Sequence, residues 1–228
     1  MLHGDRAEGE GHTFSAFDQA FSDLRLHALA MGGLVIDQVG AATKALLESD
    51  RALAARVAER EITVNQLAHD IDRESFELIA RHHPVAGDLR LAKAVSRVIV
   101  DLERAGDEAK KIALFAARYP SARISGPVAV VAQELRQMAE LSSQMLRDAV
   151  RSFDEGDPTL ARAVTARDAA LDREFEAALL HVLASSGHRD GKQLASVVDT
   201  VFALKGLERI GDHAKNIGEQ VLFVAEGE

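Results

Sequence analysis

The chain has 228 residues, of which 47% are hydrophobic and 4% aromatic, and it contains no cysteine. This length and composition are typical of one large or two small helical domains, and the lack of cysteine excludes disulfides, thiolate metal sites and thiol chemistry. The net charge of −9 argues against general binding to nucleic acid or to anionic membranes.

A charged, glycine-rich start is followed by helical periodicity. Residues 1–12 are predicted to be disordered, and they lack the apolar core of a signal peptide, which favours a cytoplasmic protein. Apolar residues over 17–42 recur at alternating steps of four and three, as in a helix bundle, and only Gln38 interrupts this seam. Asp50 is the expected N-cap of a second helix over about 51–81.

Proline marks the next boundaries. Pro84 ends the second helix, and a third helix is expected to reach about residue 118. The stretch 119–127 holds two prolines, a glycine and two serines, and we interpret it as a linker. Asp157 and the following proline predict the start of a helix. Three further helices are therefore expected, over about 128–153, 158–185 and 192–224.

One helical stretch occurs twice in the sequence. Residues 101–113, DLERAGDEAKKIA, match residues 206–218, GLERIGDHAKNIG, at eight of thirteen positions. Residues 48–61 also resemble residues 155–168. We therefore expect an all-α protein built from two tandem three-helix bundles, residues 13–118 and 128–226.

The repeated stretch places two carboxylates on one helix face. Glu103 and Asp107 are four residues apart, as are Glu208 and Asp212, so each pair repels by a few tenths of a kcal/mol. Each copy also carries a mid-helix glycine, which costs roughly 1 kcal/mol relative to alanine. A hard cation held by the carboxylates explains both penalties, and the glycine lets a neighbouring helix or a metal cluster approach.

The preceding helix of each bundle offers matching oxygen ligands. Glu61 with Asn65, and Asp168 with Asp172, have the same four-residue spacing and occupy equivalent places in the two repeats. We expect each bundle to present two facing pairs, the first with fewer anionic oxygens, and therefore two sites that differ in affinity or nuclearity. The expected metal ligands are Glu61, Asn65, Glu103, Asp107, Asp168, Asp172, Glu208 and Asp212.

The residues around these pairs suggest secondary roles. Arg104 and Arg209 are expected to orient the carboxylates. His213 and Asn216 lie beside the second pair and are positioned in the sequence to contact it.

Other interpretations remain open at this point. A single acidic pair beside an arginine is more often a solvated helix face, and a metal-free helical scaffold is the alternative. No Glu-x-x-His pair, phosphate-binding loop or nucleophile motif occurs, so the sequence gives no positive support for an oxidase, a hydrolase or any other enzyme.

The motifs in this order resemble the PhoU family of bacterial phosphate-signalling regulators. The resemblance covers about 12–225 and rests on LERAGD, LERIGDHAKNI, the opening helix with MG at 31–32, and HPVAGDLR at 83–90. It departs from the family pattern at His83, Ala105 and Lys111, and Asn65 replaces an acid.

The resemblance implies two bundles related by a pseudo-twofold axis, in a cytoplasmic protein that often dimerises. It implies a negative regulator of the phosphate-starvation response that couples the ATPase of a phosphate ABC transporter to a sensor histidine kinase. It also implies metal ions on the repeated acids, with iron, manganese, zinc or magnesium as candidates, possibly in multinuclear clusters. A relative specialised for another regulatory role is the alternative.

Overall fold

The computed structural model describes residues 7–118, 126–185 and 191–227. Within these ranges the chain forms helices only, so the predicted all-α class is confirmed. The helices are α1 (Ala7–Glu48), α2 (Arg51–His82), α3 (Gly87–Arg118), α4 (Pro127–Val130), α5 (Ala132–Glu155), α6 (Pro158–Ala184) and α7 (Gly191–Glu226).

The apolar seam of α1 lies in the core, as predicted. Met31, Val35 and Ala42 are fully buried, and so is Gln38, the polar residue within the seam. The helix begins at Ala7, earlier than the predicted start at about residue 13, while residues 1–6 lie outside the described ranges.

The predicted helix starts at Asp50 and Asp157 are confirmed by their hydrogen bonds. Asp50 Oδ1 accepts from the Leu53 amide at 2.9 Å, and Asp157 Oδ1 accepts from the Thr159 amide at 2.8 Å. Pro158 occupies the first position of α6, where a missing N–H costs nothing. These caps fix where the second helix of each bundle begins.

The fourth predicted helix is divided in two. α4 ends at Val130, and the backbone of Val131 (φ −106°, ψ 24°) leaves the helical range before α5 begins. Pro127 belongs to α4, so the helical part starts inside the predicted linker, and residues 119–125 and 186–190 lie outside the described ranges. The division accounts for one helix more than the six that the sequence predicted.

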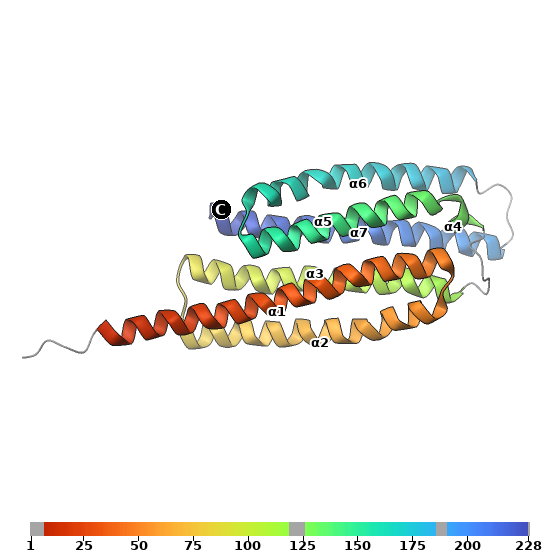
Figure 1. The fold of residues 1–228 in the computed structure, drawn as a ribbon. Coiled ribbons are helices and arrows are strands. Elements are labelled where there is room, and N and C mark those ends of the chain that lie inside the picture. The colour runs from red at the N-terminus through yellow and green to blue at the C-terminus, as the bar shows by residue number, and fades with distance from the viewer. Residues whose placement is uncertain (1–6, 119–125, 186–190, 228) are drawn as a thin grey trace, which may run out of the picture.

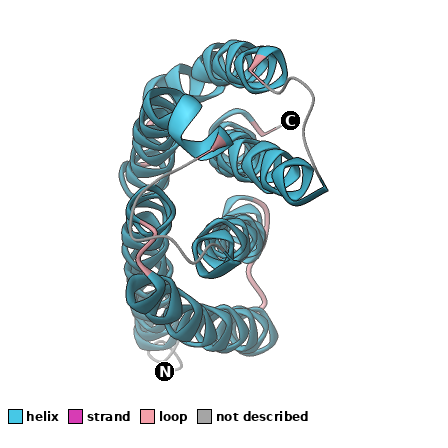
Figure 2. Cartoon of the chain, turned by 90° about the vertical axis from the view of Figure 1, so that its right-hand side faces the viewer, coloured by secondary structure: helices cyan, strands magenta, loops and turns pink. Residues whose placement is uncertain are grey.

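The helices form two bundles that lie side by side (Figure 1). One comprises α1, α2 and α3, and the other α5, α6 and α7 with the short α4. Seen from the end, α2, α1, α5 and α6 form a curved layer, and α3 and α7 lie against its inner side (Figure 2). The two predicted three-helix bundles are thus confirmed.

The helices that carry the repeated stretch pack against each other in opposite directions. Asn216 Nδ2 donates to Asp101 Oδ1 at 3.0 Å near the middle of α3. Arg118 Nη1 donates to Asp199 Oδ1 at 2.6 Å near its end. Because the pairs run in opposite order along α3 and α7, the two helices are antiparallel, as a pseudo-twofold relation requires.

None of the helices in the described ranges combines the length and the apolar character needed to cross a bilayer.

Candidate functional site

The first acidic face lies between α2 and α3. Glu103 and Asp107 are half-buried on α3, and Glu61 of α2 is fully buried beside them. Glu61 comes this close because Gly106 has no side chain. A Cβ atom at Gly106 would lie 2.9 Å from Glu61 Oε2. The glycine of the first copy therefore makes room for a buried carboxylate.

Gln38 of α1 holds this carboxylate from the core side. Its Nε2 donates to Glu61 Oε2 and, at 3.1 Å, to the carbonyl oxygen of Gly106. Glu61 Oε1 is buried and has no hydrogen-bond partner among the described residues. Gln38, the polar residue in the α1 seam, thus hydrogen-bonds the Glu61 carboxylate and leaves its Oε1 atom available.

Burial raises the pKa of Glu61 from 4.5 to about 7. The hydrogen bond from Gln38 and the charge of Lys110 oppose this shift, whereas the charges of Asp107 and Glu103 add to it. Lys110 Nζ lies 3.8 Å from Asp107 Oδ1 and supplies part of the compensating positive charge. The three predicted carboxylates of this face therefore share one electrostatic environment.

The second acidic face lies between α6 and α7 and contains lysines as well as acids. Glu208 and Asp168 are buried at the edge of the core, and Asp212 is half-buried. Lys205 Nζ donates to Glu208 Oε1 at 2.5 Å, and Lys215 Nζ donates to Asp168 Oδ2 at 2.6 Å. Glu208 Oε2 is buried and has no hydrogen-bond partner among the described residues.

Burial also raises the pKa values of Glu208 and Asp212. For Asp212 the next cause is the charge of Asp168, and Asp172 contributes as well. For Glu208 the hydrogen bond from Lys205 opposes the shift, and the charges of Asp212 and Asp172 add to it. All four predicted acids of the second repeat thus act on one another.

The geometry brings the predicted ligands into two groups but does not arrange them as a metal-binding set. In the described ranges, no three His, Asp or Glu side chains are placed so that they could hold a metal ion. Asn65 and Asp172 are exposed, one turn from Glu61 and Asp168 respectively. The donor chemistry and the unpartnered buried oxygens suit a hard cation, whereas lysine ammonium groups now lie beside several of the carboxylates.

The two repeated glycines serve different neighbours. A Cβ atom at Gly211 would lie 2.2 Å from Leu171 Cδ2 and 3.6 Å from Met145 Cε. The glycine of the second copy therefore lets α6 approach α7 through apolar side chains. The expected close approach is found at both glycines, but only at Gly106 does it admit a carboxylate.

The predicted roles of Arg209, His213 and Asn216 are wrong, and that of Arg104 stays a prediction. Arg209 Nη1 pairs with Glu108 Oε1 at 2.8 Å, and Arg104 is exposed. His213 Nδ1 lies 3.0 Å from Asp101 Oδ1, the same oxygen that Asn216 contacts. Arg209, His213 and Asn216 thus join α7 to α3 across the bundle interface, because they point away from the acidic face.

Sequence reasoning missed three residues that shape the faces: Gln38, Lys205 and Lys215. Lys110 and Lys215 occupy the same position in the two copies of the repeat, and this identity could have predicted a role for Lys215. Lys205 precedes Glu208 by three residues, a spacing at which helical side chains meet. The sequence marked Gln38 only as a polar residue within an apolar seam, which does not predict its partner.

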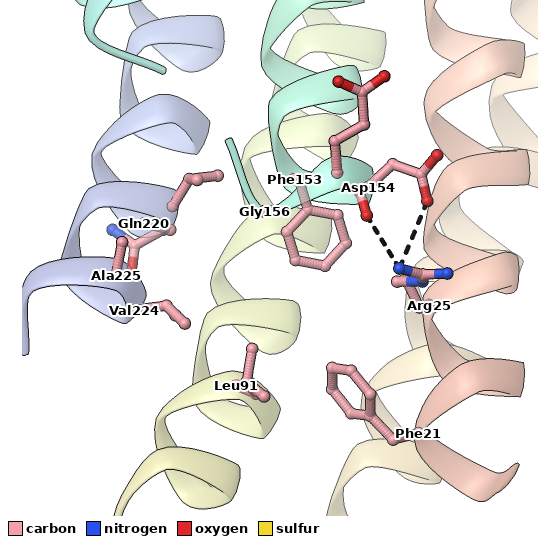
Figure 3. A pocket seen from close by; sticks show the side chains of 11 residues that line it. Phe21, Arg25, Leu91, Phe153, Asp154, Gly156, Gln220, Val224 and Ala225 are labelled. Atoms are coloured by element: carbon pink, nitrogen blue, oxygen red, sulfur yellow. Dashed lines mark hydrogen bonds and ion pairs between the residues drawn. The ribbon is translucent and has the colours of Figure 1, made fainter. Parts of the chain in front are cut away.

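A separate cavity of about 230 Å³ lies where α1, α3, α5 and α7 meet (Figure 3). Apolar side chains such as Phe21, Leu91 and Phe153 line it. On its rim, Arg25 Nη1 donates to the carbonyl oxygen of Asp154 at 2.9 Å. The cavity is part of the junction between the two bundles, and none of the predicted acids lines it.

Two tandem helical bundles with matched acidic faces define a class of duplicated helical-bundle proteins, and comparison with known proteins gives the family. The PhoU domain matches the chain twice, at residues 28–116 and 135–221. The chain is 40% identical over 216 residues to the "Phosphate-specific transport system accessory protein PhoU homolog" of Pseudomonas putida, covering 95% of this chain and 83% of that protein. It is 31% identical over 217 residues to the Escherichia coli "Phosphate-specific transport system accessory protein PhoU", covering 95% and 88% respectively.

The fold is similar to that of a solved relative. The crystal structure of PhoU from Pseudomonas aeruginosa superposes with a TM-score of 0.86 at 37% sequence identity, covering 93% of this chain and all of that one. The chain therefore belongs to the PhoU family, as its repeated motifs indicated.

Proposed function

We propose that this protein is an accessory regulator of a phosphate-specific transport system. The observation that carries the proposal is the 40% identity over 95% of the chain to a protein of that name. The identity extends over both repeats, so the proposal concerns the complete pair of bundles and not an isolated domain.

The finer proposal is that of a negative regulator of the phosphate-starvation response and of phosphate uptake. In this role the protein would act in the cytoplasm, often as a homodimer, as an adaptor between a transporter ATPase and a sensor histidine kinase. A binding function of this kind suits the elongated arrangement of helices (Figure 1), which carries the two acidic faces. It also requires no nucleophile or base, in keeping with a sequence that offers none.

The proposal includes binding of divalent or trivalent cations to the two acidic faces. Support comes from the crowded carboxylates and from the buried, unpartnered oxygens Glu61 Oε1 and Glu208 Oε2. The candidate ligands are those predicted from the sequence, and iron, manganese, zinc and magnesium ions all accept oxygen ligands. Binding would require the carboxylates to turn from Lys110, Lys205 and Lys215 towards the ion.

The experiment uses alkaline phosphatase as a reporter of phosphate starvation in phosphate-rich medium. A strain that lacks this gene receives the wild-type gene or a variant with Glu103, Asp107, Glu208 and Asp212 all changed to Ala. We expect high activity in the deletion strain, low activity with the wild type, and high activity with the variant. An absence of derepression in the deletion strain would contradict the regulatory function.

A second candidate is a scaffold that regulates without metal. It is favoured by one observation: within the described ranges, Glu208 and Asp168 have lysine partners, and no three His, Asp or Glu side chains form a metal-binding set. In this case the fourfold variant would keep its fold and would still repress the reporter. Metal content measured after purification in chelator-free buffer would separate the two candidates independently.

A further inference from the structure

An open groove adjoins the acidic face of the first repeat. It has a volume of about 410 Å³ and lies between α2 and α3, and its floor is apolar, formed by Ala68, Ile99 and Val100. Polar side chains surround the floor: Asn65, His69, Asp72 and Glu103. The groove is therefore an apolar trough with two carboxylates on its rim.

The second repeat has larger side chains at the same places. Phe175 is the equivalent of Ala68 at an offset of 107 residues, and Lys205 is the equivalent of Val100 at an offset of 105. Lys205 Nζ lies 5.3 Å from the centroid of the Phe175 ring. The trough in the first repeat thus exists because two short side chains replace an aromatic ring and a lysine.

The second repeat also shows which chemistry this space accepts. The ammonium group of Lys205 lies over the Phe175 ring and donates to Glu208 Oε1 at 2.5 Å. Glu208 is the equivalent of Glu103, the carboxylate on the rim of the open groove. A long cationic side chain suits this combination, because its methylene groups pack on the floor while its charge reaches the carboxylate.

The charges around the open groove favour the same occupant. Asp72 and Glu103 line it, and Glu61 and Asp107 lie beyond Glu103 on the same face. Lys110 faces Asp107 at 3.8 Å, and none of the described residues that line the groove is a lysine. A small hydrated ion gains nothing from Ile99 and Val100, whereas a lysine or arginine side chain buries its stem there.

We propose that the groove between α2 and α3 binds a lysine or arginine side chain of a basic, apolar-flanked helix on a partner protein. The inference rests on the proposed adaptor function, in which this chain docks onto other proteins. Asn65 and Glu103 of the groove are also candidate metal ligands, so peptide binding is measured in the absence of metal.

The test measures binding of a synthetic helical peptide with one central lysine between leucines at helical spacing. The titration uses the full-length chain in buffer with a chelator, and fluorescence anisotropy reports the peptide. We expect saturable binding that weakens at least about tenfold when norleucine replaces the lysine, since the rim carboxylates then lack a partner. Equal binding of the two peptides would overturn the proposal.

Variants that exchange the two repeats give matched controls. Ala68→Phe with Val100→Lys brings the pair of the second repeat into the groove, and we expect it to weaken peptide binding at least about tenfold. Phe175→Ala with Lys205→Val opens the second position, and we expect it to add a second site of similar affinity. Circular dichroism tests whether both variants fold. If the Phe175→Ala, Lys205→Val variant does not fold, peptide binding by the Ala68→Phe, Val100→Lys variant still tests the proposal.

Two further outcomes would contradict the proposal. The first is unchanged peptide binding by the Ala68→Phe, Val100→Lys variant. The second is displacement of the peptide by spermidine at equal concentration, which would assign the groove to a free polyamine instead of a partner helix. Failure of the proposed regulatory function would show separately, as an absence of derepression in the deletion strain, and peptide binding does not depend on that strain.

Discussion

The two acidic faces occupy equivalent places in the two bundles, but their buried carboxylates have different hydrogen-bond partners. The first buries one carboxylate, Glu61, and supports it with an amide from Gln38. The second buries two carboxylates, Glu208 and Asp168, and pairs them with Lys205 and Lys215. One duplicated scaffold thus offers an amide-supported buried acid beside an open groove in one half, and internally paired acids in the other.

The comparison explains why the same glycine is present in both halves. At Gly106 the missing side chain admits the Glu61 carboxylate, and at Gly211 it admits Leu171. Both are solutions to one requirement, the close approach of the second and third helices of each bundle. The two faces therefore admit different groups, a carboxylate and an apolar side chain, although their helices pack in the same way.

The largest expected effect comes from removing the support of the buried acid. Gln38→Met introduces the residue of the equivalent position in the second repeat, Met145. It leaves Glu61 buried without a donor, and we expect a loss of about 3 kcal/mol in the free energy of unfolding at pH 8. Chemical denaturation measures it, and a loss below about 1 kcal/mol would show that the Glu61 carboxylate finds another partner.

The next effect tests the apolar contact in the second half. Gly211→Ala places a Cβ atom 2.2 Å from Leu171 Cδ2, and Leu171 is fully buried. We expect a net loss of about 2 kcal/mol, since overpacking outweighs the gain of about 1 kcal/mol in helix propensity. Thermal unfolding measures the change, with Gly33→Ala as a control, since no atom lies within 4 Å of a Cβ at Gly33. Equal stability of the two variants would contradict the close contact.

A third prediction concerns pH. The pKa of Glu61 is raised from 4.5 to about 7 in the folded protein, so the unfolded chain releases this proton first and the stability falls as the pH rises from about 4.5 to about 7. Glu61→Gln removes this titration. In metal-free buffer we expect the variant to be more stable than the wild type by about 1–2 kcal/mol at pH 8, and to lose the advantage at pH 5.

Urea unfolding across this pH range measures the difference between the two proteins. Glu103→Gln is the matched control, because Glu103 is half-buried on the same face. A pH profile of the Glu61→Gln variant parallel to that of the wild type would contradict the assignment of the titrating group.

The smallest expected effect tests the equivalence of the two scaffolds. His27 pairs with Glu74 at 2.7 Å between α1 and α2, and Glu134 pairs with His181 at 2.6 Å between α5 and α6. The two pairs occupy equivalent positions at an offset of 107 with the residues exchanged. We expect the double variant His27→Glu, Glu74→His to melt within about 2 °C of the wild type. A markedly lower melting temperature would show that the two interfaces differ.

Much of the fold follows from the sequence. The repeat, the seam of α1 and the caps at Asp50 and Asp157 predicted two three-helix bundles. The break at Val131 was not predictable, because valine has no strong local signal for leaving a helix. Where α4 ends depends on packing against other elements instead.

The candidate site was predicted only in part. Residue spacing placed the acids on one helix face and matched them with the preceding helix. It did not show that Lys205 and Lys215 lie among the acids, or that Arg209 and His213 point to the other bundle. Helical periodicity gives the face of a residue, whereas its partner depends on rotamers and on the position of a helix far away in the sequence.

We propose that the face of the first repeat, with its open groove, contributes more to regulation than the internally paired face of the second. The most direct measurement uses the alkaline phosphatase reporter with two variants, Glu103→Ala with Asp107→Ala and Glu208→Ala with Asp212→Ala. We expect the first variant to lose most of the repression of the wild type and the second to retain most of it. Equal loss in both variants, or a greater loss in the second, would contradict this account.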